Sequence, residues 1–417
     1  MTVADSSDAT RWTGPVRAAW RVGKLRHVAR IFAGGTPDKT EPRFWEEGTV
    51  PWLNSGAVND WLISEPTTYI SDDGFRRSSA KWIPAGSLVL ALAGQGKTKG
   101  TVARIAASMT CNQSMAAIVP SGWVDNRFLQ WWLHANYAAI RSLAGGDLRD
   151  GLNLDLVGGI PVPLPQLDFQ RAIADFLDTE TARIEALITK KGRQVLLGHE
   201  RIAAVLETAA WKPGEKEMRL NRLVRRFVDY RGATPEKSDV GIPLVTAGHI
   251  KNGRVDLVVD PQFVSEETYR TWMSRGYPSI GDVLMTMEAP LGEVAQVEQL
   301  PIALAQRVIL MKADEQFVTA DFLALLLRTP SFQARLAAAA TGSTALGIRA
   351  DRLRSLSLPV PPVDEQLAAV GRVRRAAEQL RQLEKRLNVQ RRLLHEHRQA
   401  LITAAVTGEL DVPGVAP

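Results

Sequence analysis

The chain has 417 residues, of which 45% are hydrophobic and 23% charged, and its net charge is +6. These values exclude an intrinsically disordered chain and suit a globular protein with roughly two to four structural units. The single cysteine, Cys111, excludes a disulfide scaffold and a cysteine-rich zinc cluster.

No apolar run has the length of a membrane span, and residues 1–14 are polar where a signal peptide would be basic and then apolar. We therefore expect a cytoplasmic protein that has no membrane partner. The excess of basic residues permits a nucleic-acid partner without requiring one.

Residues 1–15 are expected to form a disordered tail, and residues 16–160 a mixed domain of helices and strands. The runs 87–92 and 116–119 are short and apolar, which is typical of strands, and glycine and proline separate such runs. Residues 126–142 have a helical pattern rich in aromatic residues, which we interpret as part of the core.

The segment 161–211 is predicted to contain a long helix that begins near Asp168. Lys191 and Gly198 interrupt its apolar side. At about 1.5 Å per residue the helix would be roughly 60 Å long, too long for the core of one small domain, so it needs a second helix as a partner. The residues predicted to face that partner are Leu177, Ile184, Ile188, Val195 and Ile202.

Residues 212–358 repeat the plan of the first domain. The segment 35–37 (Gly-Thr-Pro) matches 233–235 (Ala-Thr-Pro) at a shift of 198 positions (235 minus 37). Farther along, 112–114 (Asn-Gln-Ser) corresponds to 305–307 (Ala-Gln-Arg). Because the matching segments follow in the same order, the sequence indicates a duplicated globular unit.

Residues 359–417 are predicted to contain a second long helix. Residues 162–206 align with residues 358–402 at a constant shift of 196 (364 minus 168), which indicates that the two helices are copies of each other. A repeat of seven is typical of a helix that packs along another helix. The residues at this spacing are Val373, Leu380, Leu387, Leu394 and Leu401.

Each long helix opens with a proline-rich segment and a Leu/Val-x-x-Gln motif, at 167–170 and 363–366. The second helix closes with Arg-Gln-Ala-Leu-Ile-Thr-Ala-Ala-Val-Thr-Gly at 398–408. With this duplicated order the chain closely resembles, from Trp20 to Val412, the specificity subunit of type I restriction-modification systems. The resemblance implies an α+β fold in which two similar globular target-recognition domains alternate with two long helices that pair as an antiparallel coiled coil. It also implies that each domain reads one half of a split DNA sequence.

The same resemblance implies partners: double-stranded DNA, two modification (methyltransferase) subunits, and restriction subunits with translocase and nuclease activity. S-adenosylmethionine, ATP and Mg²⁺ are expected on those partners. The sequence itself has no Asn/Asp-Pro-Pro-aromatic methyltransferase motif, no complete phosphate loop, no metal-spaced histidine pair on a helix and no Gly-x-Ser-x-Gly elbow. We therefore expect a non-catalytic targeting subunit with no cofactor of its own.

Two similar domains held on a rod of fixed length would act as a caliper that reads two DNA sites and the distance between them. Because the domains differ in sequence, the half-sites are expected to differ, which makes the whole site bipartite and asymmetric. The sequence leaves two alternatives open: a coiled-coil scaffold protein that does not read DNA, and an RNA-binding adaptor.

Candidate DNA contacts come from loops in both domains. The loop 94–100 carries two lysines but lacks the first glycine of a phosphate-binding loop. Asn, Gln and Arg suit bidentate reading of adenine or guanine, although each could instead cap a turn. Thr36 and Thr234 are interpreted as braces of a turn. The predicted DNA-binding residues are Lys97, Lys99, Asn112, Gln113, Arg149, Gln306, Arg307 and Arg349.

Overall fold

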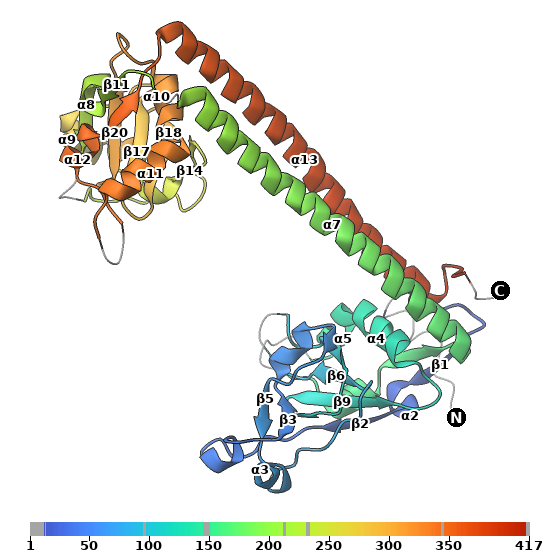
Figure 1. Cartoon of the computed structure of the whole chain (residues 1–417). Helices are drawn as coiled ribbons and strands as arrows, with labels where there is room; N and C mark the ends of the chain where they lie inside the picture. The colour runs from blue at the N-terminus through green and yellow to red at the C-terminus, as the bar shows by residue number, and fades with distance from the viewer. Residues whose placement is uncertain are drawn as a thin grey trace. The chain divides into compact units, whose positions relative to one another are not determined.

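The computed structural model describes residues 12, 14–94, 97–144, 151–211, 214–230, 234–342 and 346–413. The chain forms two compact units: unit 1 comprises Met1–Lys190 and Gln390–Pro417, and unit 2 comprises Lys191–Val389. Each unit contains one sheet-rich domain and a part of both long helices (Figure 1).

The main sheet of unit 1 has five strands in the order β2-β9-β6-β7-β4. Its neighbouring strands are antiparallel, except that β4 runs parallel to β7. A second sheet has the order β5-β3-β8, and β8 runs parallel to β3. The strands are β2 Ala29–Ala33, β3 Val50–Leu53, β4 Leu62–Ile63, β5 Thr68–Ile70, β6 Leu88–Ala91, β7 Val102–Ile105, β8 Thr110–Cys111 and β9 Met115–Pro120.

Strand β6 is buried along its whole length, which explains why its sequence is a continuous apolar run. Leu88 and Leu90 lie in the core that contains Trp132 of helix α4 (Asn126–Ala135). Val89, which points to the opposite face, lies with Cys111 in the core against the second sheet. The main sheet of unit 1 is therefore covered on both faces at this strand.

Strand β1 (Arg21–Lys24) pairs with β10 (Pro161–Leu164) and closes unit 1 next to the start of the first long helix. The backbone N–H of Arg17 donates to the carbonyl of Thr407, at 2.8 Å, so the segment before β1 also contacts the end of the second long helix. The remaining helices of unit 1 are α2 Leu25–Val28, η1 Pro42–Phe44, η2 Ser55–Asn59, α3 Asp72–Arg76, α5 Tyr137–Ser142 and α6 Leu154–Gly158.

Unit 2 repeats this plan, with a sheet in the order β12-β20-β17-β18 and a second sheet in the order β16-β13-β19. The strands β12, β20, β17 and β18 correspond in this order to β2, β9, β6 and β7 of unit 1. Strand β11 pairs with β21 as β1 pairs with β10. The duplicated α+β plan predicted from the sequence is thus confirmed. The strands are β11 Glu217–Arg219, β12 Val224–Asp229, β13 Ile242–Val245, β14 Ile250–Lys251, β15 Arg254–Val255, β16 Phe263–Val264, β17 Val283–Met287, β18 Leu291–Gln296, β19 Ala303–Leu304, β20 Val308–Ala313 and β21 Ser357–Pro359. The shorter helices are α8 Leu220–Leu223, η3 Ala247–His249, α9 Glu266–Trp272, η4 Met273–Arg275, α10 Ala320–Leu326, α11 Pro330–Ala339 and α12 Ala350–Ser355.

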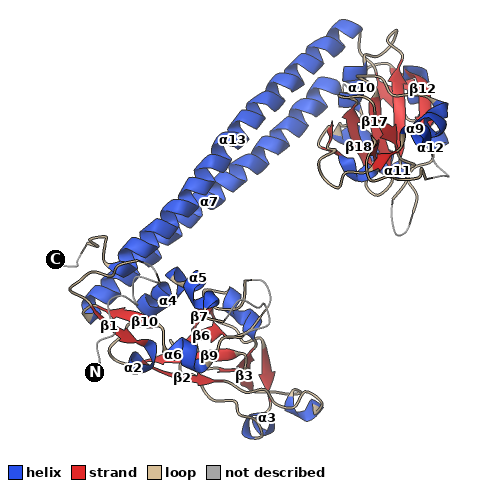
Figure 2. Ribbon diagram, turned by 180° about the vertical axis from the view of Figure 1, so that it is seen from behind, coloured by secondary structure: helices blue, strands red, loops and turns tan. Residues whose placement is uncertain are grey.

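The two long helices are α7 (Leu167–Ala210, 44 residues) and α13 (Val363–Thr407, 45 residues). In unit 1 the beginning of α7 shares a core with the end of α13, where Leu177 and Ile402 are both fully buried. In unit 2 the end of α7 shares a core with the beginning of α13, which contains both Leu206 and Val373. The helices therefore pair in antiparallel orientation, and Figure 2 shows them running alongside each other.

The sequence pattern selects ten residues for the seam between the two helices, and all of them are buried or half-buried. Leu177, Ile184, Ile188, Val373 and Leu387 are buried, and Val195, Ile202, Leu380, Leu394 and Leu401 are half-buried. Gly198, by contrast, is not the interruption that the pattern suggests. A Cβ atom on Gly198 would lie 2.4 Å from Cδ1 of Leu380, so the glycine makes room for a leucine of the other helix.

A buried glutamine fastens the start of α7 to the globular part of unit 1. The Nε2 atom of Gln170 donates to the carbonyls of Pro165 (2.8 Å) and Trp123 (3.2 Å), and its Oε1 accepts from the backbone N–H of Asp125 (2.8 Å). Asp125 is the N-cap of α4, so one side chain joins two helices and the strand-to-helix turn. This glutamine is the last residue of the Leu/Val-x-x-Gln motif.

The second copy of the motif makes the same three bonds in unit 2. The Nε2 atom of Gln366 donates to the carbonyls of Pro361 (2.9 Å) and Phe317 (2.8 Å), and its Oε1 accepts from the N–H of Thr319 (2.9 Å), the N-cap of α10. Both glutamines have no exposed surface. The motif is therefore an anchor of each long helix on its own domain.

We expect the stability of unit 1 to fall at acidic pH through His134 of α4, whose ring lies edge-on to Trp61 and Trp131. Burial, and secondly the positive charge of Arg398, lowers the pKa of His134 from 6.5 to about 4. Between these two values the unfolded chain binds a proton that the folded chain does not. Stability is therefore fully present above pH 6.5, and up to about 3 kcal/mol is lost as the pH falls towards 4.

Denaturant unfolding of His134→Phe at pH 7.5 and 4.5 would measure this loss. The variant is expected to have a flatter pH dependence than the wild type, whereas His27→Phe, at an exposed position, should keep the wild-type curve. Equal pH dependence in wild type and His134→Phe would contradict the assignment.

Candidate nucleic-acid interface

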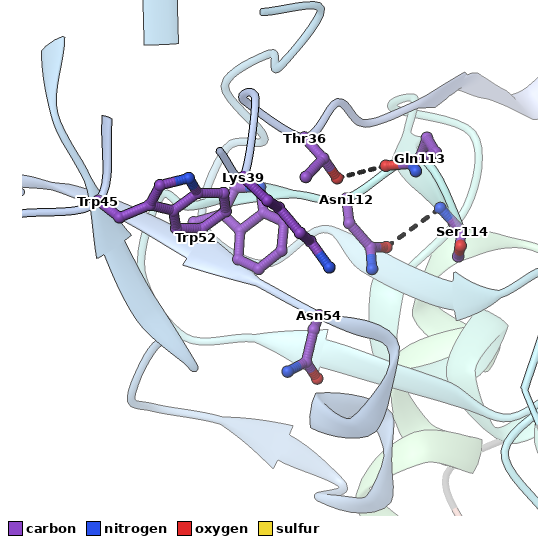
Figure 3. A pocket seen from close by; sticks show the side chains of 8 residues that line it. All are labelled: Thr36, Lys39, Trp45, Trp52, Asn54, Asn112, Gln113 and Ser114. Atoms are coloured by element: carbon purple, nitrogen blue, oxygen red, sulfur yellow. Dashed lines mark hydrogen bonds between the residues drawn. The ribbon is translucent and has the colours of Figure 1, made fainter. Parts of the chain in front are cut away.

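Unit 1 has a pocket of about 450 Å³ where three loops of the globular domain meet. One loop follows β2, the second follows β3, and the third is the turn between β8 and β9. Figure 3 shows the side chains that gather around it, namely Thr36, Lys39, Trp45, Trp52, Asn54, Asn112, Gln113 and Ser114.

Two glycines allow the first of these loops to pack closely, Gly34 on the third loop and Gly35 on the segment 79–80. A Cβ atom on Gly34 would be 2.0 Å from the carbonyl oxygen of Cys111, and one on Gly35 would be 2.4 Å from the backbone nitrogen of Ala80. The Gly35 N–H donates to the Cys111 carbonyl at 2.8 Å. This close approach places Thr36 beside Gln113, so the Gly-Thr-Pro segment builds the pocket.

The amide side chains of the pocket are held by hydrogen bonds to their oxygens. The Oδ1 atom of Asn54 accepts from Gly56 N at 2.8 Å, and that of Asn112 accepts from Ser114 N at 3.1 Å. The Thr36 hydroxyl donates to Oε1 of Gln113. These amides are therefore oriented before any ligand arrives.

Two tryptophans form an aromatic wall. Trp45 and Trp52 meet edge to face, with ring centroids 5.2 Å apart. Trp52 donates its indole N–H to the carbonyl of Gly35 (2.9 Å), and Trp45 donates to that of Asp38 (3.0 Å). Lys39 lies next to Asp38 with its side chain exposed. The pocket therefore combines amide side chains with two tryptophan rings and the charged side chain of Lys39.

The structure brings only Asn112 and Gln113, of the predicted DNA-binding residues, into this pocket. Lys97 is exposed, and its carbonyl accepts a hydrogen bond from the hydroxyl of Tyr137 (2.9 Å). Lys99 is only 6% exposed, so its burial does not support the predicted contact. Arg149 lies outside the described residues.

The predicted arginines of unit 2 have carboxylate partners within the chain. Nε of Arg307 lies 2.8 Å from Oε1 of Glu288, and the Arg349 guanidinium binds Asp351 with both branches, at 3.0 and 3.1 Å. Gln306 is half-buried. A base contact by either arginine would have to compete with its carboxylate, so these contacts stay predictions.

Lys39, Trp45, Trp52 and Asn54 line the pocket but were not among the residues predicted from the sequence. The internal repeat carries a signal that could have found Asn54, because Thr246 stands in its place in unit 2. Where two copies of a domain carry different hydrogen-bonding groups at matching positions, those residues are candidates for contacts with different ligands.

Among the described residues, no group of three or more His, Cys, Asp or Glu side chains is placed to hold a metal ion. The part of the chain that the structure describes likewise contains no helix long and apolar enough to cross a membrane. Burial raises the pKa of the Cys111 thiol to about 12, so this side chain stays protonated at neutral pH.

Comparison with known proteins finds one family model, the type I restriction modification DNA specificity domain, which matches residues 18–196. The chain is 26% identical over 158 residues to the specificity subunit of the type I restriction enzyme EcoR124I/EcoR124II of Escherichia coli, a match that covers 37% of this chain and 39% of that protein. It is 20% identical over 428 residues to the EcoKI specificity subunit of Escherichia coli strain K12, which covers 95% of this chain and 90% of that one.

Two solved structures are similar in fold. One, from a study of complex assembly and conformational transition of the type I R-M system, has a TM-score of 0.73 at 16% identity and covers 95% of this chain and 99% of its own. The other is the HsdS subunit from Thermoanaerobacter tengcongensis, with a TM-score of 0.57 at 16% identity, covering 96% of this chain and 100% of its own.

Proposed function

Because this chain belongs to the family of type I restriction-modification DNA specificity subunits, we propose that its two globular domains each read one half of a bipartite DNA site. The observation that carries the proposal is the pocket of unit 1, in which amides and a lysine stand beside an aromatic wall. Such side chains suit base edges and phosphates of DNA.

The two half-sites differ in this proposal, so that the whole site is asymmetric. The two units share one strand order, yet Thr246 and Ala305 of unit 2 stand where unit 1 has Asn54 and Asn112. The same loop positions therefore offer different hydrogen-bonding groups, and equal half-sites are not expected.

The chain acts as a targeting subunit, and the chemistry belongs to its partners. Two modification subunits supply methyl transfer from S-adenosylmethionine, and restriction subunits supply ATP-driven translocation and Mg²⁺-dependent cleavage, all in the cytoplasm. The long helices offer a surface for such partners. Leu196 and Leu197 of α7 are 59% and 50% exposed, and Leu383 and Val389 of α13 are 38% and 47% exposed. Exposed apolar side chains on both long helices suit a contact with another protein.

The test uses the chain together with its modification subunits. Mapping of the methylated adenines in the DNA of the source organism gives the site, and binding to a duplex with that site is measured at several salt concentrations. We expect site-specific binding whose logarithmic affinity falls with the logarithm of salt by about 0.9 for each neutralised phosphate. The purified chain alone should transfer no methyl group.

A complex that binds DNA without a salt slope or sequence preference would favour the scaffold alternative. Methyl transfer by the isolated chain would contradict the division of labour between this subunit and its partners.

A further inference from the structure

The three amides of the unit 1 pocket share one feature: each has its oxygen engaged inside the protein. Asn54 accepts from Gly56 N and Asn112 from Ser114 N, while Gln113 accepts from a threonine hydroxyl. A backbone N–H can only donate, so chemistry itself determines which amide atom is the oxygen in Asn54 and Asn112. Their NH₂ groups are left for a ligand. In Figure 3 the nitrogen of Asn112 points away from Ser114 and into the open part of the pocket.

The pocket therefore presents hydrogen-bond donors: the NH₂ groups of Asn54, Asn112 and Gln113, and the ammonium group of Lys39. A ligand that fits this set must present acceptors. In the major groove, guanine presents two acceptors, N7 and O6, and thymine presents only one, O4, beside its apolar methyl group, whereas adenine and cytosine each present an amino donor that would meet a donor here. Phosphate also presents acceptors, but the wall of Trp45 and Trp52 favours a planar ring over a tetrahedral ion.

We propose that this pocket recognises a guanine, through its O6 and N7 atoms, in the half-site that unit 1 reads. The inference rests on the proposed function and makes it more specific, because the sequence alone left adenine and guanine equally open for Asn112 and Gln113. The site is built by the fold: its donors come from three loops that β3, β8 and the segment after β2 bring together.

Unit 2 does not repeat this donor set. Thr246, in the place of Asn54, forms a capping box with His249, and Ala305 stands in the place of Asn112. Arg307 is paired with Glu288. The guanine contact is thus assigned to one half-site and not to the other.

The experiment changes the protein and the DNA independently. In the protein, Asn112→Asp and Asn54→Asp each keep the oxygen that accepts from the backbone but replace the NH₂ donor by an acceptor. In the DNA, each guanine of the mapped site is replaced singly by 7-deazaguanine, which lacks the N7 acceptor. Asn59→Asp, at an exposed position near Asn54, adds the same charge outside the pocket and serves as the control.

With the complex of chain and modification subunits, one guanine is expected at which 7-deazaguanine lowers the affinity about tenfold or more. Asn112→Asp should lower the affinity for the natural site by a similar factor and should abolish the effect of the analogue at that guanine only. Asn59→Asp should leave the effect of the analogue in place. Coupling between a single side chain and a single base atom identifies a direct contact.

The inference is overturned if neither half-site contains guanine, if no single analogue weakens binding, or if Asn112→Asp and Asn59→Asp weaken binding to all sequences alike. The last result would assign the pocket to phosphate. Each of these outcomes leaves the proposed function intact, whereas a wild-type complex without any sequence preference would overturn that function itself. The DNA analogues alone decide the question should an aspartate variant fail to fold, because they leave the protein unchanged.

Discussion

Replacing Leu387 by aspartate is expected to destabilise the helix pair of unit 2 and to abolish binding to the bipartite site. Leu387 is 5% exposed on α13, at a position that the seven-residue pattern assigns to the seam with α7. Loss of a buried leucine side chain costs roughly 2 to 5 kcal/mol, and a carboxylate without a partner adds the cost of its desolvation. The cores of the globular domains lie away from this position and should stay folded.

Chemical unfolding and site-specific DNA binding measure the two parts of this prediction. Asn388→Asp, the next residue of α13 at an exposed position, introduces the same charge into solvent and should change the free energy of unfolding by less than about 0.5 kcal/mol. A Leu387→Asp variant with wild-type unfolding and wild-type affinity would show that the helix pair is not needed for recognition.

Replacing Gln170 by leucine is expected to cost unit 1 at least about 3 kcal/mol. The side chain is fully buried, and its removal leaves the N–H of Asp125 and the carbonyls of Trp123 and Pro165 without their partner. Each buried group left unpaired costs about 1 to 3 kcal/mol. The start of α7 would then no longer be fixed on its domain, so sequence-specific binding should also fall under conditions in which the variant is folded.

Gln194→Leu, at an exposed position of the same helix, is the matched control and should have little effect. Gln170→Glu separates the accepted hydrogen bond from the two donated ones, because it keeps the acceptor for the N–H of Asp125 but removes the donor to the carbonyls of Trp123 and Pro165. Full stability in Gln170→Leu would mean that the apolar contacts of α7 hold the helix without the anchor.

The fold was largely predictable, and the reason lies in its duplication. A constant shift between the helical segments 162–206 and 358–402 is a strong signal because it compares the chain with itself, and the seven-residue spacing of Leu380, Leu387 and Leu394 follows from helix geometry alone. The misread position was Gly198. A spacing pattern describes one helix, whereas the fit of Leu380 against this glycine depends on both.

The candidate site was predictable only in part. Asn112 and Gln113 were found because they are polar residues between apolar strands. Asn54 and Trp52 were missed because they reach the pocket only when β3 lies beside β8, a pairing between segments almost 60 positions apart. The partner of Arg307 was equally hidden, since Glu288 comes from a different strand end.

The anchors formed by Gln170 and Gln366 have a consequence for the evolution of this chain. Every partner of both glutamines is a main-chain group. Because main-chain groups are the same in every sequence, mutations can alter the side chains of a globular domain without weakening its attachment to the helix. Recombination could even replace a whole domain, provided that the turn before the helix and the first residue of the capped helix keep their backbone course. This attachment through main-chain groups lets the side chains of the recognition surface change while the long helices that carry the domains stay the same.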